Sequence, residues 1–238
     1  MQLLHGDCLK LMKDIPDGSV DLVLCDPPYG TTDCSWDSVL PFDMLWAEYD
    51  RLLKVDGAAV LFAAQPFTTS LIESNRKAFR YCWYWMKNTP TGFAFAKYQP
   101  MRKVEDICVF YLKHGTYNPQ GVVEIYGDKV KRKKSSRTDG VYKMDTLTRE
   151  YIPRFKNYPK NVLQFSTERG LHPTQKPVPL LEYLVKTYTN EGDTVLDNCM
   201  GSGSTGVAVK RVGGRHFIGI EKNKVYFDIA QQRIHGTS

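Results

Sequence analysis

Short apolar runs alternate with stretches of helical periodicity along most of this 238-residue chain. Two of the runs, "VDLVLC" at 20–25 and "GAAVLFAA" at 57–64, are apolar at nearly every position. Continuous apolar strands are typical of a parallel sheet that helices cover on both faces, because neither face then meets water. The alternation of such strands with helices predicts an α/β fold built on a mostly parallel sheet.

The alternation breaks between residues 114 and 170. This segment holds several tyrosines and the run "KVKRKKSSR" at 129–137, in which six of nine residues are basic. Such a run is either a solvated loop or a nucleic-acid contact. We expect 1–113 and 171–238 to be two halves of one domain, with 114–170 as a small insertion between them.

A glycine loop lies in the C-terminal half. Residues 201–206, "GSGSTG", form G-x-G-x-x-G between an expected strand and an expected helix. Glu221 follows the next strand, 20 positions after Gly201, where an acid can bond ribose hydroxyls. This pattern fits either a nicotinamide-dependent oxidoreductase or an enzyme that binds S-adenosylmethionine.

The position of the loop separates these two cofactors. In a nicotinamide enzyme the loop usually opens the sheet, whereas here too little chain follows it to complete one, so the missing strands must come from the N-terminal half. Asp197 ends the strand before the glycines and suits an ammonium group. Both features favour S-adenosylmethionine, which combines ribose hydroxyls with an amino-acid end.

The apolar run at 20–25 ends abruptly in Asp26-Pro27-Pro28-Tyr29. Ligands of open α/β sheets bind outside the carboxyl ends of the strands, and proline holds the residue before it extended. We therefore expect the Asp26 carboxylate and the Pro27 carbonyl to accept both hydrogens of a nucleobase amine, while Tyr29 stacks on the base. Positioning of that amine against a methyl donor needs no covalent enzyme intermediate. A proline turn that merely caps the strand is the alternative.

Five segments in this order closely resemble the amino-methyltransferases of DNA, in the β-type order of adenine-N6 and some cytosine-N4 enzymes. They are "HGDCLKLM", "DPPYG", "HPTQKP", "DNCMGSGSTGVAV" and "FIGIEKNKVYFDIAQQRI". The resemblance implies a Rossmann-like sheet with a circularly permuted motif order and a target-recognition role for the insertion. "DNCM", where the family often has an aromatic residue after Asp, and Ser204, where Thr is common, are small departures.

The resemblance also assigns residues to the cofactor. Asp7 approaches its adenine, and "HPTQKP" folds over its methionine end. Within that segment Lys176 is the candidate for the cofactor carboxylate because of its charge, and His172 either contacts the cofactor or orders the turn. The full set of expected cofactor residues is Asp7, Cys8, His172, Thr174, Lys176, Asp197, Met200, Gly201, Ser202, Gly203, Ser204, Thr205 and Glu221.

The implied activity is methyl transfer from S-adenosylmethionine to N6 of an adenine that is flipped out of double-stranded DNA. Cytosine N4, for which the family more often has Ser in place of Asp26, RNA adenine and a catalytically inactive DNA-binding module are the alternatives. Basic residues of the insertion should neutralise phosphates. Trp36 either lies on a loop that closes over the base or is an anchor of the core. The expected DNA-binding residues are Trp36, Lys129, Lys131, Arg132, Lys133, Lys134 and Arg137.

Composition narrows the remaining classes. The chain has a formal net charge of +6, and no run of about eighteen apolar residues that could cross a membrane. Its six cysteines are scattered without a C-x-x-C pair, so we expect no metal site. The start lacks a signal-peptide stretch, so a cytoplasmic protein is expected, and the family resemblance makes a homodimer plausible.

Overall fold

The computed structural model of the chain describes residues 1–30, 38–125, 154–168, 170 and 175–236. The chain divides into two compact units. Residues 1–118 and 160–238 form the main unit, and residues 119–159 form a smaller one. In the smaller unit, β6 (Val123–Glu124) and β7 (Phe155–Lys156) pair antiparallel, and Asn157 donates a 2.6 Å hydrogen bond to the Gly121 carbonyl.

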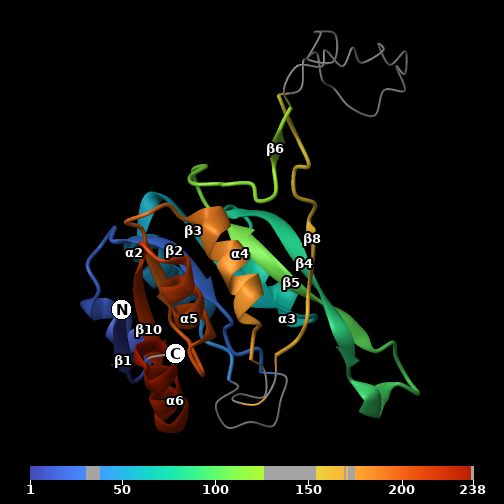
Figure 1. Cartoon of the computed structure of the whole chain (residues 1–238). Helices are drawn as coiled ribbons and strands as arrows, with labels where there is room; N and C mark the ends of the chain where they lie inside the picture. The colour runs from blue at the N-terminus through green and yellow to red at the C-terminus, as the bar shows by residue number, and fades with distance from the viewer. Residues whose placement is uncertain (31–37, 126–153, 169, 171–174, 237–238) are drawn as a thin grey trace. The chain divides into compact units, whose positions relative to one another are not determined.

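Among the described residues, the main unit contains one eight-stranded sheet (Figure 1). All neighbouring strands run parallel except β5, which is antiparallel to both of its neighbours. The predicted mostly parallel α/β sheet is therefore confirmed. In spatial order the strands are β1 (Gln2–His5), β10 (His216–Glu221), β9 (Thr194–Asp197), β2 (Val20–Cys25), β3 (Leu53–Ala63), β5 (Arg102–Phe110), β4 (Phe79–Thr91) and β8 (Val162–Phe165).

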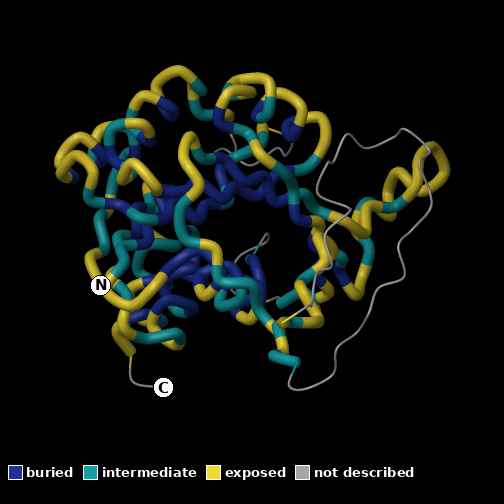
Figure 2. Tube along the Cα trace, turned by 90° about the horizontal axis from the view of Figure 1, so that it is seen from above, coloured by how far each residue is buried: buried dark blue, intermediate teal, exposed yellow. Residues whose placement is uncertain are grey.

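Helices cover both faces of this sheet. They are α1 (Cys8–Leu11), α2 (Phe42–Leu52), α3 (Phe67–Ser74), α4 (Val178–Tyr188), α5 (Ser204–Val212) and α6 (Lys224–His235), with 3-10 turns η1 (Met12–Asp14) and η2 (Phe93–Phe95). Leu22 and Leu24 of β2 pack on the side of α4, α5 and α6, whereas Val23 and Cys25 pack on the side of α1, α2 and α3. The strands are accordingly the most buried part of the unit (Figure 2).

The chain order brings two distant segments together at the middle of the sheet. β9, from the C-terminal half, lies beside β2, from the N-terminal half, in parallel. Their carboxyl ends therefore share one edge of the sheet, together with those of β1 and β10. This is the rotated strand order expected from the late position of the glycine loop, and it places the functional segments side by side.

The bounds of the two units differ from those expected from the sequence. β8 lies within the segment 114–170 that was expected to be an insertion, yet it pairs with β4 in the main sheet. The compact smaller unit is correspondingly shorter, at 119–159. Within the described residues, no helix is long and apolar enough to span a bilayer.

Candidate active site

A cavity of about 450 Å³ opens at the carboxyl edge of β1, β10, β9 and β2. Its walls come from segments that are far apart in the sequence, including most of the predicted functional residues that the structure describes. The predicted residues lining it are Asp7, Cys8, Asp26, Pro27, Pro28, Tyr29, Lys176, Asp197, Met200, Gly201, Ser202, Ser204, Thr205 and Glu221. One cavity thus joins the expected catalytic and cofactor segments.

Asp26 directly follows β2 and is fixed by its own tetrapeptide. The Tyr29 hydroxyl donates a 2.5 Å hydrogen bond to Asp26 Oδ1. The Tyr29 ring stacks on Phe67, with ring centroids 4.9 Å apart. Burial and the Asp26 charge raise the pKa of Tyr29 well above its ordinary value, so its hydroxyl stays a proton donor. Tyr29 thus orients the carboxylate; its predicted stacking on a base stays a prediction.

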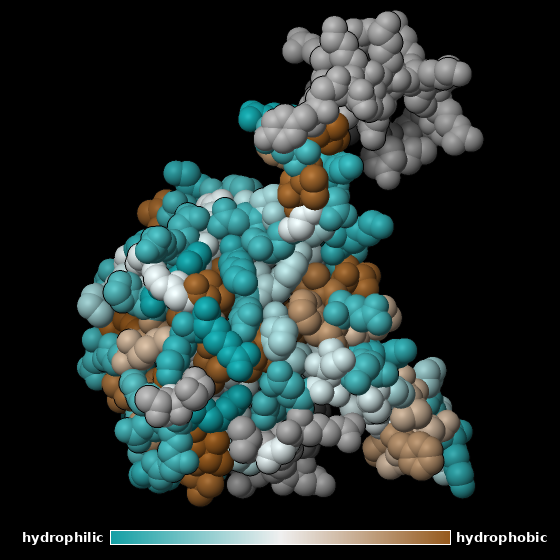
Figure 3. Space-filling model, viewed as in Figure 1, coloured by the Kyte–Doolittle hydropathy of each residue, from teal (hydrophilic) through white to brown (hydrophobic). Residues whose placement is uncertain are grey.

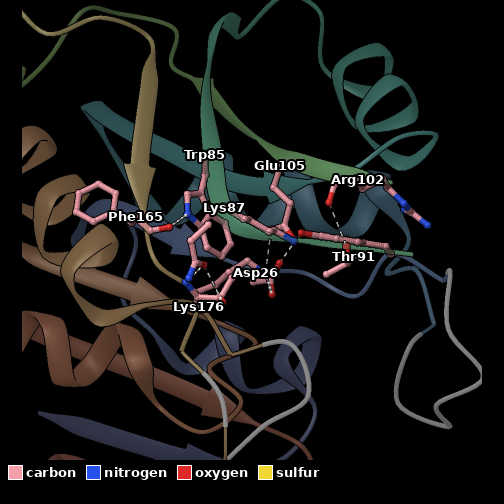
Figure 4. A network of polar contacts seen from close by, with 11 residues as sticks. Asp26, Trp85, Lys87, Thr91, Arg102, Glu105, Phe165 and Lys176 are labelled. Carbon is pink, nitrogen blue, oxygen red and sulfur yellow. Dashed lines mark hydrogen bonds and ion pairs between the residues drawn. The ribbon is translucent and has the colours of Figure 1, made fainter. Parts of the chain in front are cut away.

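The Lys176 ammonium group contacts the Asp26 carboxylate. The residue precedes Pro177, which begins the approach to α4 in an extended conformation, so Lys176 is held outside the helix. Its ammonium group forms an ion pair with Asp26 Oδ2 and lies 3.6 Å from Glu105 Oε2 (Figure 4). The predicted contact of Lys176 with the cofactor carboxylate stays a prediction.

Lys176 belongs to a row of alternating charges. Glu105 of β5 accepts a hydrogen bond from Lys87 of β4 through its other oxygen, Oε1. Burial acts to raise the pKa of Glu105, but the two lysines together lower it below its ordinary value. Burial acts to lower the pKa of Lys176, but Asp26 and Glu105 raise it. Glu105 and Lys176 therefore both stay charged at neutral pH.

Glu221 ends β10 and holds the glycine loop. Its Oε2 accepts a 2.9 Å hydrogen bond from the Gly201 amide, and its Oε1 accepts one of 2.6 Å from the Asn223 amide. Burial raises the pKa of Glu221, while these amides act in the opposite direction. A carboxylate on the cavity wall in this position suits the hydroxyls of a ribose.

Asp197 ends β9 and is almost fully buried, with 3% of its surface exposed. Burial raises its pKa to about 7, although hydrogen bonds from Thr205 and from the Cys199 amide oppose this shift. Because burial disfavours the charged form of Asp197, this carboxylate would be stabilised by a ligand that brings a positive charge.

The three glycines of the loop have different physical roles. Gly201 and Gly203 adopt left-handed conformations, with φ of 51° and 79°, which glycine adopts without strain. A Cβ on Gly203 would come within 2.8 Å of Ala230, and one on Gly206 within 2.4 Å of Ile234. Gly203 and Gly206 therefore let α5 pack closely on α6, which fixes the direction of the loop.

Asp7 and Cys8 begin α1 beside this loop. The Asp7 carboxylate caps the helix by accepting a 3.1 Å hydrogen bond from the Leu9 amide. A hydrogen bond with Cys199 and burial raise the pKa of Cys8, and burial raises that of Cys25 to about 12. These thiols stay protonated and act as small apolar residues rather than nucleophiles.

Sequence reasoning missed Glu105 and Lys87. Both lie in apolar strands, "VEDICVF" and "FRYCWYWMK", and the register pairs Trp85 with Glu105, which puts Lys87 on the same face. A charged residue inside an otherwise buried strand was the available signal. Asn198, whose side chain accepts a 2.7 Å hydrogen bond from the Tyr49 hydroxyl, was also missed.

Several predicted residues lie outside the described part of the chain. This holds for Trp36, His172 and Thr174, and for the basic residues Lys129, Lys131, Arg132, Lys133, Lys134 and Arg137. Their roles stay predictions. Among the residues that the structure describes, no group of three or more His, Cys, Asp or Glu side chains could hold a metal ion.

The residues of the cavity fit S-adenosylmethionine. The volume of about 450 Å³ lies within the range of small-molecule sites, roughly 300–1,000 Å³. Glu221 offers acceptors for ribose hydroxyls, and Asp197 offers a buried anion for the ammonium of the amino-acid end. Asp26 lies on the wall of the same cavity. Fold and site together define an S-adenosylmethionine-dependent methyltransferase that acts on an exocyclic amine.

Comparisons with known proteins identify the family. Residues 20–232 match the N6/N4 family of DNA methylases, and the chain belongs to this family. It is 31% identical over 250 residues to the DNA adenine methyltransferase YhdJ of Escherichia coli, covering 98% of this chain and 82% of that protein. It is 28% identical over 257 residues to the type II methyltransferase M.HpaI of Haemophilus parainfluenzae, covering 98% and 74%.

Solved structures agree with this assignment. The M1.HpyAVI–SAM complex superposes with a TM-score of 0.68 at 25% identity, covering 98% of each chain. The cytosine-N4-specific PvuII DNA methyltransferase superposes with a TM-score of 0.70 at 18% identity, covering 99% of this chain and 87% of that one. At 18% identity, the similarity to the PvuII enzyme is evidence of a shared fold and of nothing more. The chain is thus a DNA methyltransferase that uses S-adenosylmethionine.

Proposed function

We propose that this enzyme methylates N6 of adenine in double-stranded DNA after flipping the base out of the helix. The observation that carries this is Asp26: its carboxylate is fixed by Tyr29 on the wall of the cavity that also contains Asp197 and Glu221. By family resemblance an aspartate at this position favours adenine N6, because cytosine-N4 enzymes more often have serine there. The relative YhdJ is named a DNA adenine methyltransferase.

The protein's part in the reaction is to present the amine. The lone pair of the adenine amine is delocalised into the ring, which makes it a poor nucleophile. Asp26 and the Pro27 carbonyl would accept its two hydrogens and turn the lone pair toward the donor. The bound cofactor supplies a methyl group on a positively charged sulfur. In that transfer the electron pair of the broken carbon–sulfur bond would stay on sulfur, and the proton that the amine loses would pass to water.

The base is identified by its product. DNA is incubated with the enzyme and with S-adenosylmethionine labelled in the methyl group, digested to nucleosides and examined by mass spectrometry. We expect the label in N6-methyladenine. Label in N4-methylcytosine would overturn the adenine assignment, and transfer to RNA in preference to duplex DNA would overturn the substrate. No transfer at all, with cofactor still bound, would indicate an inactive DNA-binding module.

A β-hairpin, residues 88–104, supplies a described surface for DNA. β4 runs parallel to β2, so the hairpin joining β4 to β5 leaves the sheet at the edge where Asp26 lies. Figure 1 shows it as the long green arm, and Figure 3 shows apolar and hydrophilic surface side by side on it. The hairpin contains no Asp or Glu, and its cations are the exposed Lys97, Arg102 and Lys103.

Aromatic side chains accompany these cations. Phe93 is 82% exposed and Tyr98 is 86% exposed at the tip of the hairpin. Cations without intervening acids suit phosphates, and exposed rings suit stacking on unpaired bases. We infer that the hairpin contacts DNA next to the flipped base.

The segment 114–170 is proposed to recognise the target sequence. The support is the concentration of basic residues at 129–137 and the family resemblance of its position between the catalytic and "HPTQKP" segments. Exchange of this segment with that of a relative, followed by sequencing of modified bases, tests the assignment. A changed methylated sequence is expected, and an unchanged one contradicts it.

A homodimer and a cytoplasmic location are also proposed, on the family resemblance. Light scattering of the purified chain tests the first. A mass near twice 27.2 kDa is expected, and a monomer at every concentration tested contradicts it.

A further inference from the structure

The catalytic carboxylate is paired with a buried cation. Lys176 Nζ forms an ion pair with Asp26 Oδ2, across 150 residues of sequence. The Lys176 side chain is only 8% exposed, and its ammonium also lies 5.1 Å from the centre of the Phe62 ring. A lysine is rarely buried to this extent unless anions compensate its charge. The placement therefore requires both Asp26 and Glu105.

Glu105 fixes Lys176 from the opposite side. Its Oε2 lies 3.6 Å from Lys176 Nζ and, among the described residues, accepts no hydrogen bond. Its Oε1 is occupied by Lys87, whose ammonium also lies 5.2 Å from the Trp85 ring. Oε2 is thus a buried acceptor within a short movement of the Lys176 ammonium.

The four groups balance only as a set. Two carboxylates alternate with two ammonium groups, so the net charge of the row is zero (Figure 4). Without Lys176, two half-buried carboxylates remain beside a single ammonium group, that of Lys87, which contacts Glu105 and not Asp26. Carboxylates that share a site cannot both ionise readily. Asp26 would then take up a proton more readily and lose acceptor capacity.

Resting on the proposed function, we propose that Lys176 is a positioning residue for methyl transfer. Its ammonium pairs with the Asp26 carboxylate and fixes the direction of that carboxylate toward the target amine, and Glu105 with Lys87 holds Lys176 in place. Each Asp26 oxygen keeps acceptor capacity for the amine after binding Tyr29 or Lys176. Glu105 Oε2 receives part of the Lys176 charge when the amine also donates to Asp26.

The competing role is the one predicted from sequence, in which Lys176 binds the carboxylate of the cofactor. The two roles predict different losses. A positioning residue changes how turnover depends on pH and leaves cofactor affinity nearly intact. A cofactor ligand weakens cofactor binding and leaves the pH dependence where it was.

The experiment compares three variants, Lys176→Met, Glu105→Gln and Lys87→Met. It measures kcat/KM for DNA between pH 4.5 and 9 at saturating S-adenosylmethionine, and cofactor affinity by calorimetry. Saturation keeps Asp197 ionised, which matters because Asp197 faces Asp26, as do Tyr29, Cys25, Glu105 and Lys176. Lys87→Met is the matched control, since it removes the same charge from the row without touching Asp26.

Opposite shifts are expected. In Lys176→Met the acid limb of the profile moves up by about one pH unit, so the extra loss relative to pH 8.5 appears as the pH falls through the limb and approaches about ten-fold below it. In Glu105→Gln the limb moves down, because a negative charge near Asp26 is removed. Lys87→Met moves it up by less than half the Lys176→Met shift. Cofactor affinity changes by less than about three-fold in all three variants.

Two results overturn the proposal. One is an equal loss at every pH in Lys176→Met; the other is a cofactor affinity more than ten-fold weaker with an unmoved acid limb. If Lys176→Met does not fold, Lys176→Arg replaces it: the retained charge should keep the acid limb near that of the wild type, and an upward shift of a full unit contradicts the proposal. If the product analysis found the label in N4-methylcytosine, only the adenine assignment would fail. The pH comparison of the three variants would still test the role of Lys176, with the cytosine N4 amine as the target.

Discussion

The two ends of the cavity hold their carboxylates in opposite ways. At the catalytic end, Asp26 and Glu105 face the ammonium groups of Lys176 and Lys87. At the cofactor end, Glu221 and Asp197 accept hydrogen bonds from uncharged backbone amides. Burial acts to raise the pKa at both ends. The lysines reverse this at Glu105, whereas the pKa of Asp197 rises to about 7.

The difference follows from what each ligand brings. S-adenosylmethionine carries an ammonium group and ribose hydroxyls, so in the proposed arrangement the anions of the cofactor end would gain their partners when it binds. The target amine is neutral and brings no charge, so the catalytic end must supply its own cations to keep a carboxylate ionised. A buried anion held by neutral donors therefore marks the place where a ligand contributes the positive charge.

The largest expected effect is at the catalytic end. Asp26→Ala removes the acceptor of the amine, and we expect methyl transfer to fall by about 10³-fold, the size typical of losing a transition-state hydrogen-bond group. Cofactor affinity should change by less than about three-fold, because Asp197 and Glu221 are untouched. Single-turnover transfer and calorimetry measure the two quantities. Turnover near that of the wild type would refute the acceptor role and, with it, the comparison of the two ends.

The next effect is at the cofactor end. Glu221→Ala removes a charged hydrogen-bond acceptor from the ribose and releases the Gly201 amide. Hydrogen bonds to charged groups contribute about 1.5–3 kcal/mol, so the dissociation constant of S-adenosylmethionine should rise by roughly 10–150-fold. Transfer at saturating cofactor should fall far less. If the variant bound cofactor normally and lost turnover instead, the two ends would not be functionally separate.

A pH series tests the raised pKa of Asp197. Below pH 7 the free enzyme carries a proton on this carboxyl, which must leave before an ammonium can pair with it. Cofactor affinity should therefore fall with decreasing pH below 7, by at most about ten-fold per unit, and level off above it. Calorimetry from pH 5.5 to 8.5 measures this. Asp197→Asn should bind more weakly but with a flat profile, and an equally steep profile in that variant would assign the proton to another group.

Sequence reasoning located the cofactor end better than the catalytic end. Asp197, Gly201 and Glu221 belong to two adjacent strands and one loop, so local patterns were sufficient to group them. The contact of Lys176 with Asp26 joins positions 150 residues apart, and Glu105 lies within a strand that reads as ordinary core. Pairing across a sheet depends on strand order, which sequence periodicity does not specify.

The same limit applies to the small elements. β8 has only four residues, "VLQF", in a stretch without clear periodicity, and its strand identity comes from pairing with β4. The hairpin 88–104 extends two strands whose apolar parts alone were predicted. Its exposed rings fall outside any buried pattern, because their role depends on a partner rather than on the core.

The smallest effect concerns DNA at the catalytic end. Lys97 and Lys103 of the hairpin are exposed at the edge of the sheet where Asp26 lies, whereas Lys113 is exposed beyond the other end of β5. Replacing Lys97 and Lys103 together by Ala should weaken DNA binding by several-fold and reduce the slope of log K against log salt by about one to two. Cofactor binding should be unchanged. Lys113→Ala is the matched control, and fluorescence anisotropy between 50 and 200 mM salt measures both. Equal slopes in all three proteins would place DNA elsewhere, and the catalytic end would then receive its base without help from the hairpin.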